Sequence, residues 1–203
     1  HNELTLIDTF HEYPNQFNLY SAISKYYNIN LHNLTIGYGA TEVLERIFKA
    51  INIKHLYIVS PTFEMVEVYC NVYKVAYTKI SYTELTQLPN YSTSAVYIAN
   101  PSGNTGESHN LEWIIDNFNL CIVDEAYADF CKINSLLSKK IDHLIVIKTL
   151  SKSLGIAGFR VGFCKANSTI TTKLQSVRSN YIMNTFASKL VPILLPYTDK
   201  IVQ

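Results

Sequence analysis

The chain has 203 residues, of which 48% are hydrophobic and 16% are charged, and its formal net charge at pH 7 is +1. This length allows one or two domains with a substantial buried core. The near-neutral charge provides no electrostatic footprint for nucleic acid or for an anionic membrane surface. No apolar stretch approaches the roughly 20 residues of a membrane-spanning helix. The composition therefore favours a globular protein with neither nucleic-acid nor membrane partners.

The elements expected from the sequence alternate between short apolar strands and helical segments. The strands are rich in Val, Ile and Tyr and are bounded by polar or turn residues. The helices place apolar residues on one face, as Val43, Leu44, Ile47 and Ile51 show. In chain order, the expected elements are helices Leu19–Tyr27 and Thr41–Ile51, strand His55–Ser60, helix Phe63–Tyr69, strands Lys74–Ser81 and Ala95–Ala99, helix Leu111–Asn117, strands Leu120–Asp124, Leu144–Lys148 and Val161–Lys165, and helices Thr169–Arg178 and Ala187–Leu195.

This alternation predicts an α/β fold with three layers, in which helices cover both faces of a mostly parallel central sheet. In such sheets, ligands bind beyond the carboxyl ends of the strands. The residues with chemical potential fall at those ends repeatedly, so we expect one ligand site there.

The four cysteines form neither a C-x-x-C pair nor a zinc-binding pattern, and the histidines show no metal-ligand spacing. Cys70, Cys121, Cys131 and Cys164 are expected to be free thiols, mostly buried, in a cytoplasmic protein rather than the framework of a disulfide-rich one. No metal site is expected.

The most informative segment is the stretch from Lys148 to Gly162, which follows a strand-like run. It places Lys152 next to a serine and a glycine-containing turn, with an arginine eight residues on. A lysine amine can form a Schiff base with an aldehyde. Ser151 and Arg160 supply donors that suit a phosphate group. Pyridoxal phosphate requires this combination of groups.

Asp124 ends the apolar run that begins at Leu120 and is followed by Glu125, Ala126 and Tyr127. A carboxylate at this place could pair with the pyridine nitrogen of pyridoxal phosphate and keep the ring protonated. The Asp-Glu-Ala-Tyr stretch also resembles a Walker B segment. That alternative requires a G-x-x-x-x-G-K-[ST] loop, which the chain lacks. A strand-end aspartate that caps the next helix is a further alternative.

Two turns beyond the strands are weaker signals. Asn100 begins an Asn-Pro-Ser-Gly turn, and its amide could donate to a ring oxygen, although the same four residues are ordinary turn formers. The segment Gly37–Glu42 opens a helix, where backbone amides can bind phosphate and Thr41 can add a hydroxyl. A simple helix cap is the alternative for this second turn.

Phe63 follows a strand after Ser60-Pro61-Thr62. An aromatic ring at this place could stack on a cofactor ring, and an ordinary core position is the alternative.

Taken together, the order and separation of these motifs from Tyr13-Pro14 to about Ala187 resemble the fold-type I pyridoxal-phosphate enzymes, the class I/II aminotransferases. The likeness is greatest to histidinol-phosphate aminotransferases and threonine-phosphate decarboxylases. The resemblance implies that Lys152 binds the cofactor as a Schiff base and later acts as a general base. It also implies that Ser151, Arg160 and the amides of Ala40 and Thr41 bind the cofactor phosphate.

The same resemblance implies roles for five further residues. Asp124 would face the pyridine nitrogen, Tyr127 and Asn100 would contact the ring oxygen, and Phe63 would stack on the ring. Tyr13 would reach the phosphate in a neighbouring subunit, so a homodimer is expected. The catalytic set is then Lys152, Asp124 and Tyr127.

The resemblance also divides the chain into domains. Residues 1–30 would form an N-terminal segment and residues 31–203 the large cofactor-binding domain. The family has a C-terminal small domain with an arginine that binds the substrate carboxylate, and this sequence ends before that domain, so we expect the domain to be missing here. The chain also lacks an initiator methionine, so we expect both ends to be cut from a longer protein.

The expected reaction is transfer of an amino group between an amino acid and a 2-oxo acid, with a phosphorylated, histidinol-phosphate-like amino donor among the candidates. Two alternatives stay open at this point. The first is decarboxylation of an amino-acid phosphate on the same scaffold, and the second is a non-catalytic relative that serves as a binding or structural subunit.

Overall fold

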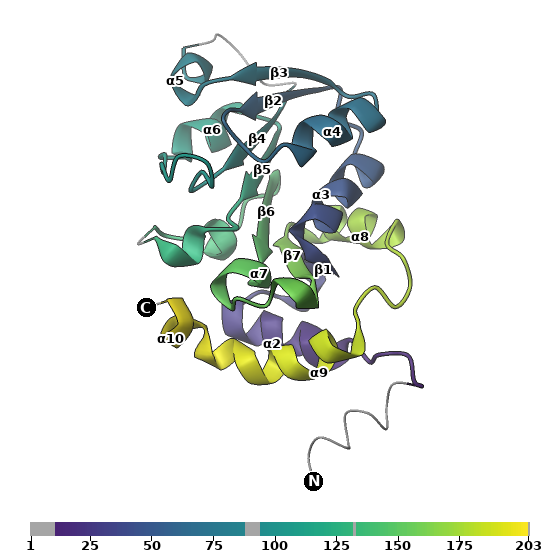
Figure 1. Ribbon diagram of the computed structural model, residues 1–203. Helices are drawn as coiled ribbons and strands as arrows, with labels where there is room; N and C mark the ends of the chain where they lie inside the picture. Colours follow the sequence, from purple (N-terminus) through teal and green to yellow (C-terminus); the bar gives the residue numbers. More distant parts are fainter. Residues whose placement is uncertain (1–10, 88–93, 132, 203) are drawn as a thin grey trace.

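The computed structural model describes residues 11–87, 94–131 and 133–202, and a seven-stranded sheet lies at its centre (Figure 1). Across the sheet the strand order is β1-β7-β6-β5-β4-β2-β3. The strands are β1 (Leu34–Tyr38), β2 (His55–Val59), β3 (Ala76–Ile80), β4 (Ala95–Ala99), β5 (Leu120–Asp124), β6 (Leu144–Thr149) and β7 (Val161–Lys165).

The five adjacent strands β3, β2, β4, β5 and β6 are parallel. Strand β7 runs antiparallel to both of its neighbours, β6 and β1. The predicted mostly parallel sheet is therefore confirmed. The reversed direction of β7 brings its amino end to the edge where the parallel strands have their carboxyl ends. Arg160 stands directly before β7 and so lies at that edge.

Helices cover both faces of the sheet, which confirms the three-layer arrangement (Figure 1). One face packs against α2, α6 and α9, and the other packs against α3, α4 and α8. The helices are α2 (Phe17–Tyr27), α3 (Gly39–Ala50), α4 (Met65–Val72), α5 (Tyr82–Leu85), α6 (Glu112–Asn117), α7 (Leu150–Ser153), α8 (Ser168–Ser176), α9 (Thr185–Leu194) and α10 (Thr198–Val202).

Alternation along the central strands explains why the core has two halves. In β6, Leu144 and Val146 belong to the core under α2 and α9, whereas Ile145 and Ile147 belong to the core under α3. Successive side chains of a strand point to opposite faces, so a strand covered on both sides reads as a continuous apolar run.

All twelve elements expected from the sequence are present, with ends that differ by a few residues at most. The sequence reading missed β1 and the short helices α5, α7 and α10. Strand β1 is only five residues long, contains Gly37, and is buried at four of its five positions, so it has no alternating pattern. A short run of this kind carries little local strand signal.

Among the described residues, no helix is both long and apolar enough to span a membrane. The four cysteines are unpaired, and Cys70, Cys121 and Cys164 are buried. Burial raises the pKa of the Cys121 and Cys164 thiols to about 12, so both remain protonated at neutral pH.

Candidate active site

An open cavity of about 720 Å³ lies at the carboxyl edge of the parallel strands. Its wall includes the last residues of three neighbouring strands, Ala99 of β4, Asp124 of β5 and Thr149 of β6. This is the place where open α/β sheets bind ligands, and the volume is within the range of small-molecule sites. Eight of the ten residues expected at a cofactor site line this cavity: Ala40, Thr41, Phe63, Asp124, Tyr127, Ser151, Lys152 and Arg160.

Lys152 sits on α7, the single helical turn that follows β6. The Thr149 hydroxyl caps this turn by accepting a hydrogen bond of 3.2 Å from the Ser151 amide. The Lys152 side chain is exposed to the cavity, with Nζ 5.3 Å from the centroid of the Tyr127 ring.

Lys148, four residues earlier, provides the contrast. Its side chain is buried, and its Nζ donates to Asp129 Oδ1 at 2.6 Å. Of the two lysines, Lys152 is thus the one placed to react with a ligand.

Asp124 is buried at the cavity wall, and both of its carboxylate oxygens have partners. Oδ2 accepts a hydrogen bond of 2.9 Å from the Tyr97 hydroxyl, and Oδ1 accepts one of 2.9 Å from the Ala126 amide. Burial raises the pKa of the Asp124 carboxyl, while the two hydrogen bonds act in the opposite direction. The capping alternative is thus partly right, because Asp124 holds the following turn, but the carboxylate also faces the cavity.

Tyr97 is a residue of this site that the sequence reading missed. It lies in the middle of β4 and is fully buried, and within β4 it looks like any other apolar strand residue. Burial, together with the adjacent Asp124 carboxylate, raises the pKa of its hydroxyl well above the ordinary value. The raised pKa favours the protonated hydroxyl, which is the form that donates the hydrogen bond to Asp124.

The other end of the cavity, which we call the anion end, is lined by the amino end of a helix and an arginine, groups of a kind that commonly bind anions. Ala40 and Thr41 lie in the first turn of α3, where backbone amides have no partner within the helix. Arg160 approaches the same turn, with its guanidinium carbon 5.6 Å from the centroid of the Tyr38 ring. A Cβ atom at Gly39 would lie 2.6 Å from Arg160 Nη2, so the glycine leaves room for the arginine.

Gly162 on β7 allows the backbone of the first turn of α3 to lie directly against β7. A Cβ atom there would lie 2.7 Å from Ala40 Cα and would collide with the Ala40 amide nitrogen. The helix turn and β7 therefore touch backbone to backbone, which keeps Arg160 beside the first amides of α3.

Asn100, expected to contact a ring oxygen, directly follows the cavity-lining Ala99, and its side chain is bound to the backbone of the following loop. Its side-chain oxygen accepts the His109 amide at 2.9 Å, and its Nδ2 donates to the His109 carbonyl at 3.1 Å. Asn100 thus clamps the base of the loop that follows β4. Within this loop, Gly103 and Asn104 line the cavity, and a Cβ atom at Gly103 would lie 2.6 Å from the Tyr127 ring.

Phe63 lines the cavity and is 42% exposed, so the core alternative for this residue is wrong. Tyr13 does not line this cavity. Its ring is 75% exposed and stacks on Tyr181, with the ring centroids 4.0 Å apart. Among the described residues, no group of three or more His, Cys, Asp or Glu side chains could hold a metal ion.

Comparison with known proteins finds a family model that matches almost the whole chain. The family model described as aminotransferase class I and II matches residues 1–198. A histidinol-phosphate aminotransferase from Brachyspira hyodysenteriae is 34% identical over 194 residues, which cover 89% of this chain and 54% of the relative. One from Pyrococcus furiosus is 26% identical over 204 residues, covering 94% of this chain and 60% of the relative. The chain thus spans between half and two thirds of the length of these relatives.

Solved structures show the same fold. Histidinol-phosphate aminotransferase from Clostridium acetobutylicum has a TM-score of 0.82 and 20% identity, covering 99% of this chain and 67% of that one. L-threonine-O-3-phosphate decarboxylase from Porphyromonas gingivalis has a TM-score of 0.82 and 18% identity, covering 96% of this chain and 67% of that one. At these identities, the likeness to both structures concerns the fold alone.

Proposed function

The chain belongs to the aminotransferase class I and II family, and from this premise we propose that it forms the cofactor-binding part of a pyridoxal-phosphate-dependent aminotransferase. The reaction would transfer an amino group between an amino acid and a 2-oxo acid. The observation that supports it best is a single cavity lined by an exposed lysine, a buried carboxylate and the amino end of a helix, namely Lys152, Asp124 and α3.

The groups around the cavity fit pyridoxal phosphate in both charge and chemistry. Burial raises the pKa of Asp124 because it destabilises the charged carboxylate. A protonated pyridine nitrogen beside Asp124 would be a cationic partner that stabilises this charge. The amides of Ala40 and Thr41, the Ser151 hydroxyl and the Arg160 guanidinium would bind the phosphate. When bound, the cofactor supplies a protonated ring that takes up electrons from a bond broken at the substrate carbon.

The protein's own residues then have separate tasks. Lys152 Nζ would hold the cofactor covalently until a substrate amine takes its place, and the freed amine would remove the α-proton of the substrate. Asp124, fixed by Tyr97 and the Ala126 amide, would keep a proton on the ring nitrogen. Phe63 would cover one face of the ring.

The amide that contacts the ring oxygen would come from Asn104, together with the Tyr127 hydroxyl. Support comes from the cavity wall, which includes Asn104 and Tyr127 but not Asn100. Asn100, with its side chain bound to the His109 backbone, would act by holding the loop in place.

The names of the relatives favour a phosphorylated amino donor that resembles histidinol phosphate. We further propose a homodimer, in which the exposed Tyr13 ring reaches the phosphate site of the neighbouring subunit. Residues 31–203 would form the large cofactor-binding domain and residues 1–30 an N-terminal segment. A cytoplasmic location is supported by the four unpaired thiols.

Absorbance spectroscopy tests the cofactor assignment. Addition of pyridoxal phosphate to the wild-type chain should produce the band of a lysine-bound cofactor near the visible edge, and Lys152→Ala should abolish that band. Lys173→Ala, which removes an exposed lysine on α8, serves as the control and should keep it. An unchanged spectrum in Lys152→Ala would refute the assignment. Product analysis then tests the reaction, because formation of a keto product requires an amino acceptor whereas release of carbon dioxide does not.

A further inference from the structure

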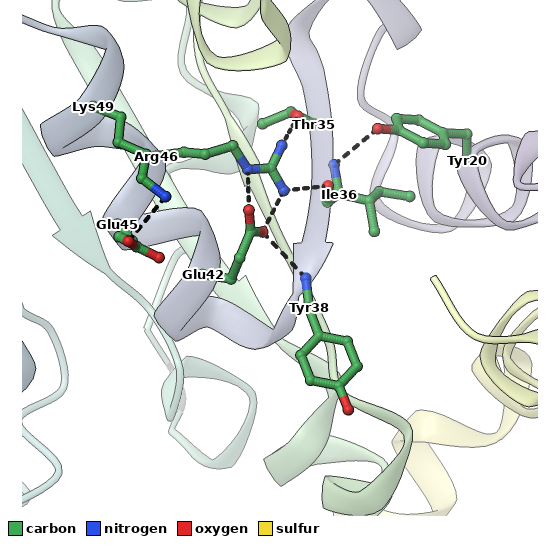
Figure 2. A network of polar contacts seen from close by, with 8 residues as sticks. All are labelled: Tyr20, Thr35, Ile36, Tyr38, Glu42, Glu45, Arg46 and Lys49. Carbon is green, nitrogen blue, oxygen red and sulfur yellow. Dashed lines mark hydrogen bonds and ion pairs between the residues drawn. The ribbon is translucent and has the colours of Figure 1, made fainter. Parts of the chain in front are cut away.

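Directly behind the anion end of the cavity, α3 contains a forked ion pair between Glu42 and Arg46 (Figure 2). Arg46 Nε donates to Glu42 Oε1 at 2.7 Å, and Arg46 Nη2 donates to Glu42 Oε2 at 2.5 Å. The remaining contacts of the guanidinium go to the Thr35 hydroxyl at 3.0 Å and to the Ile36 carbonyl at 2.7 Å. The Arg46 side chain is only 1% exposed, and that of Glu42 is 24% exposed.

Glu42 also reaches back to the start of the helix. Its Oε2 accepts a hydrogen bond of 3.2 Å from the Tyr38 amide, at the point where β1 ends and α3 begins (Figure 2). A Cβ atom at Gly37 would lie 2.5 Å from Arg46 Nη2 and 2.6 Å from a Val43 methyl, and would collide with the Glu42 carboxylate. The pair is therefore packed tightly against the turn that leads into Ala40 and Thr41.

The position of Glu42 creates an electrostatic conflict. A carboxylate in the first turn of a helix is favourable for the helix itself, because it faces the positive end of the helix dipole. An incoming phosphate requires that same positive end, and a full negative charge one residue beyond Thr41 would repel it. The bidentate contact with Arg46 cancels that charge at close range.

A second acidic-basic pair on the same helix lacks these features. Glu45 and Lys49 have the same four-residue spacing, with Lys49 Nζ 2.9 Å from Glu45 Oε1 (Figure 2). Their side chains are 30% and 41% exposed, respectively, so solvent screens their charges. The exposed Glu45–Lys49 pair can therefore serve as a control for the buried Glu42–Arg46 pair.

We propose that Glu42 and Arg46 form a charge-neutral positioning pair for the anion site. Glu42 holds the Tyr38 amide and thereby orients the first turn of α3. Arg46 cancels the Glu42 charge, so that the amides of Ala40 and Thr41 still attract an anion. The identification of this anion as the cofactor phosphate rests on the proposed function, whereas the charge balance itself concerns any phosphate-like anion.

The test is titration of the full chain with inorganic phosphate, followed through the amide NMR shifts of Ala40 and Thr41. Arg46→Met leaves the Glu42 charge uncancelled and should weaken phosphate binding about tenfold. The double variant Glu42→Gln/Arg46→Met removes both charges and should bind within about threefold of wild type, because the glutamine oxygen can still accept the Tyr38 amide. The control Lys49→Met should leave the affinity unchanged.

The inference is overturned if adding Glu42→Gln does not restore the phosphate affinity lost in Arg46→Met. It is also overturned if Lys49→Met weakens phosphate binding as much as Arg46→Met does, or if the amides of Ala40 and Thr41 do not respond to phosphate in wild type. Should Arg46→Met alone fail to fold, the double variant and Arg46→Lys decide. Both must keep the wild-type affinity to within about threefold, and a tenfold loss in either rejects the charge balance. The absorbance band of lysine-bound pyridoxal phosphate is a separate readout, so failure of the proposed function would be visible independently.

Discussion

Gly162 offers a quantitative test of how the site is held together. In Gly162→Ala the new methyl would collide with the Ala40 amide nitrogen and the Gly39 carbonyl carbon and would lie 2.7 Å from Ala40 Cα, whereas ordinary contacts of a Cβ atom lie at 3.4–4 Å. Relief requires β7 and the first turn of α3 to separate by roughly 1 Å, against a cost of overpacking of about 1–3 kcal/mol. Gly162 pairs with Gly37 of β1 on one side and with Thr149 of β6 on the other. Because β7 is bonded on both edges it cannot move aside, so we expect the upper end, about 3 kcal/mol.

Urea unfolding measures this cost. With a slope of roughly 2–3 kcal/mol per molar, the midpoint of Gly162→Ala should fall by about 1 M. The affinity for pyridoxal phosphate should fall as well, because the displaced turn contains Ala40 and Thr41. The control is Gly158→Ala, since a Cβ atom at Gly158 meets nothing within 4 Å. Its unfolding free energy should stay within about 0.5 kcal/mol of wild type. The reasoning is refuted if the two variants are equally stable and bind the cofactor equally well.

Three further predictions concern side chains around the cavity. Asn104→Ala should weaken pyridoxal phosphate binding about tenfold without lowering stability. Asn100→Ala should instead lose about 1 kcal/mol of stability, because the partly buried amide and carbonyl of His109 lose their side-chain partner. Equal binding losses for the two variants in spectroscopic titrations would contradict this difference. Asp129→Asn should lower the free energy of unfolding in urea by about 3–5 kcal/mol, because it leaves the charge of Lys148, whose side chain is 2% exposed, without its partner. Lys148→Met should lower it clearly less, because the Asp129 side chain is 20% exposed. The reverse order would contradict the view that an unpaired Lys148 charge costs more than an unpaired Asp129 charge. Burial raises the pKa of Asp124 above its ordinary value of 3.8, so the folded state without cofactor loses stability as pH rises from that value through the raised pKa. The stability of Asp124→Asn relative to wild type should therefore increase from pH 4 to pH 7 in the absence of cofactor, and a decrease would refute the sign.

The fold was largely predictable because it depends on local patterns. Apolar runs such as Leu120–Asp124 and the helical face from Val43 to Ile51 each report their own structure. Strand β1 was missed because its strand character comes from pairing with β7, more than 120 residues later in the chain. Pairing of this kind leaves no trace within five residues, one of which is a glycine.

The same distinction separates the predictable and unpredictable parts of the site. Asp124 ends β5 and Lys152 lies on the short helix that follows β6, and the topology of the sheet brings the ends of these strands together. Asn100 also stands at a strand end, but its amide is bound by the His109 backbone, a contact that depends on the path of the following loop. Tyr97 acts through its hydroxyl from within a core strand, where the sequence reports only burial.

The Glu42–Arg46 pair illustrates an intermediate case. Its four-residue spacing is visible in the sequence, but the neighbouring Glu45 and Lys49 have the same spacing. The burial of Arg46 against β1 and the contact of Glu42 with the Tyr38 amide separate the two pairs, and burial of a charged side chain is not expected from sequence.

The most direct test of the central claim is to identify the lysine that binds pyridoxal phosphate. The wild-type chain is mixed with the cofactor, reduced with borohydride, digested and analysed by mass spectrometry of the peptides. We expect a pyridoxyl group on Lys152, the lysine exposed in the cavity, and none on the buried Lys148. A label confined to another lysine, or no stable label at all, would contradict this expectation.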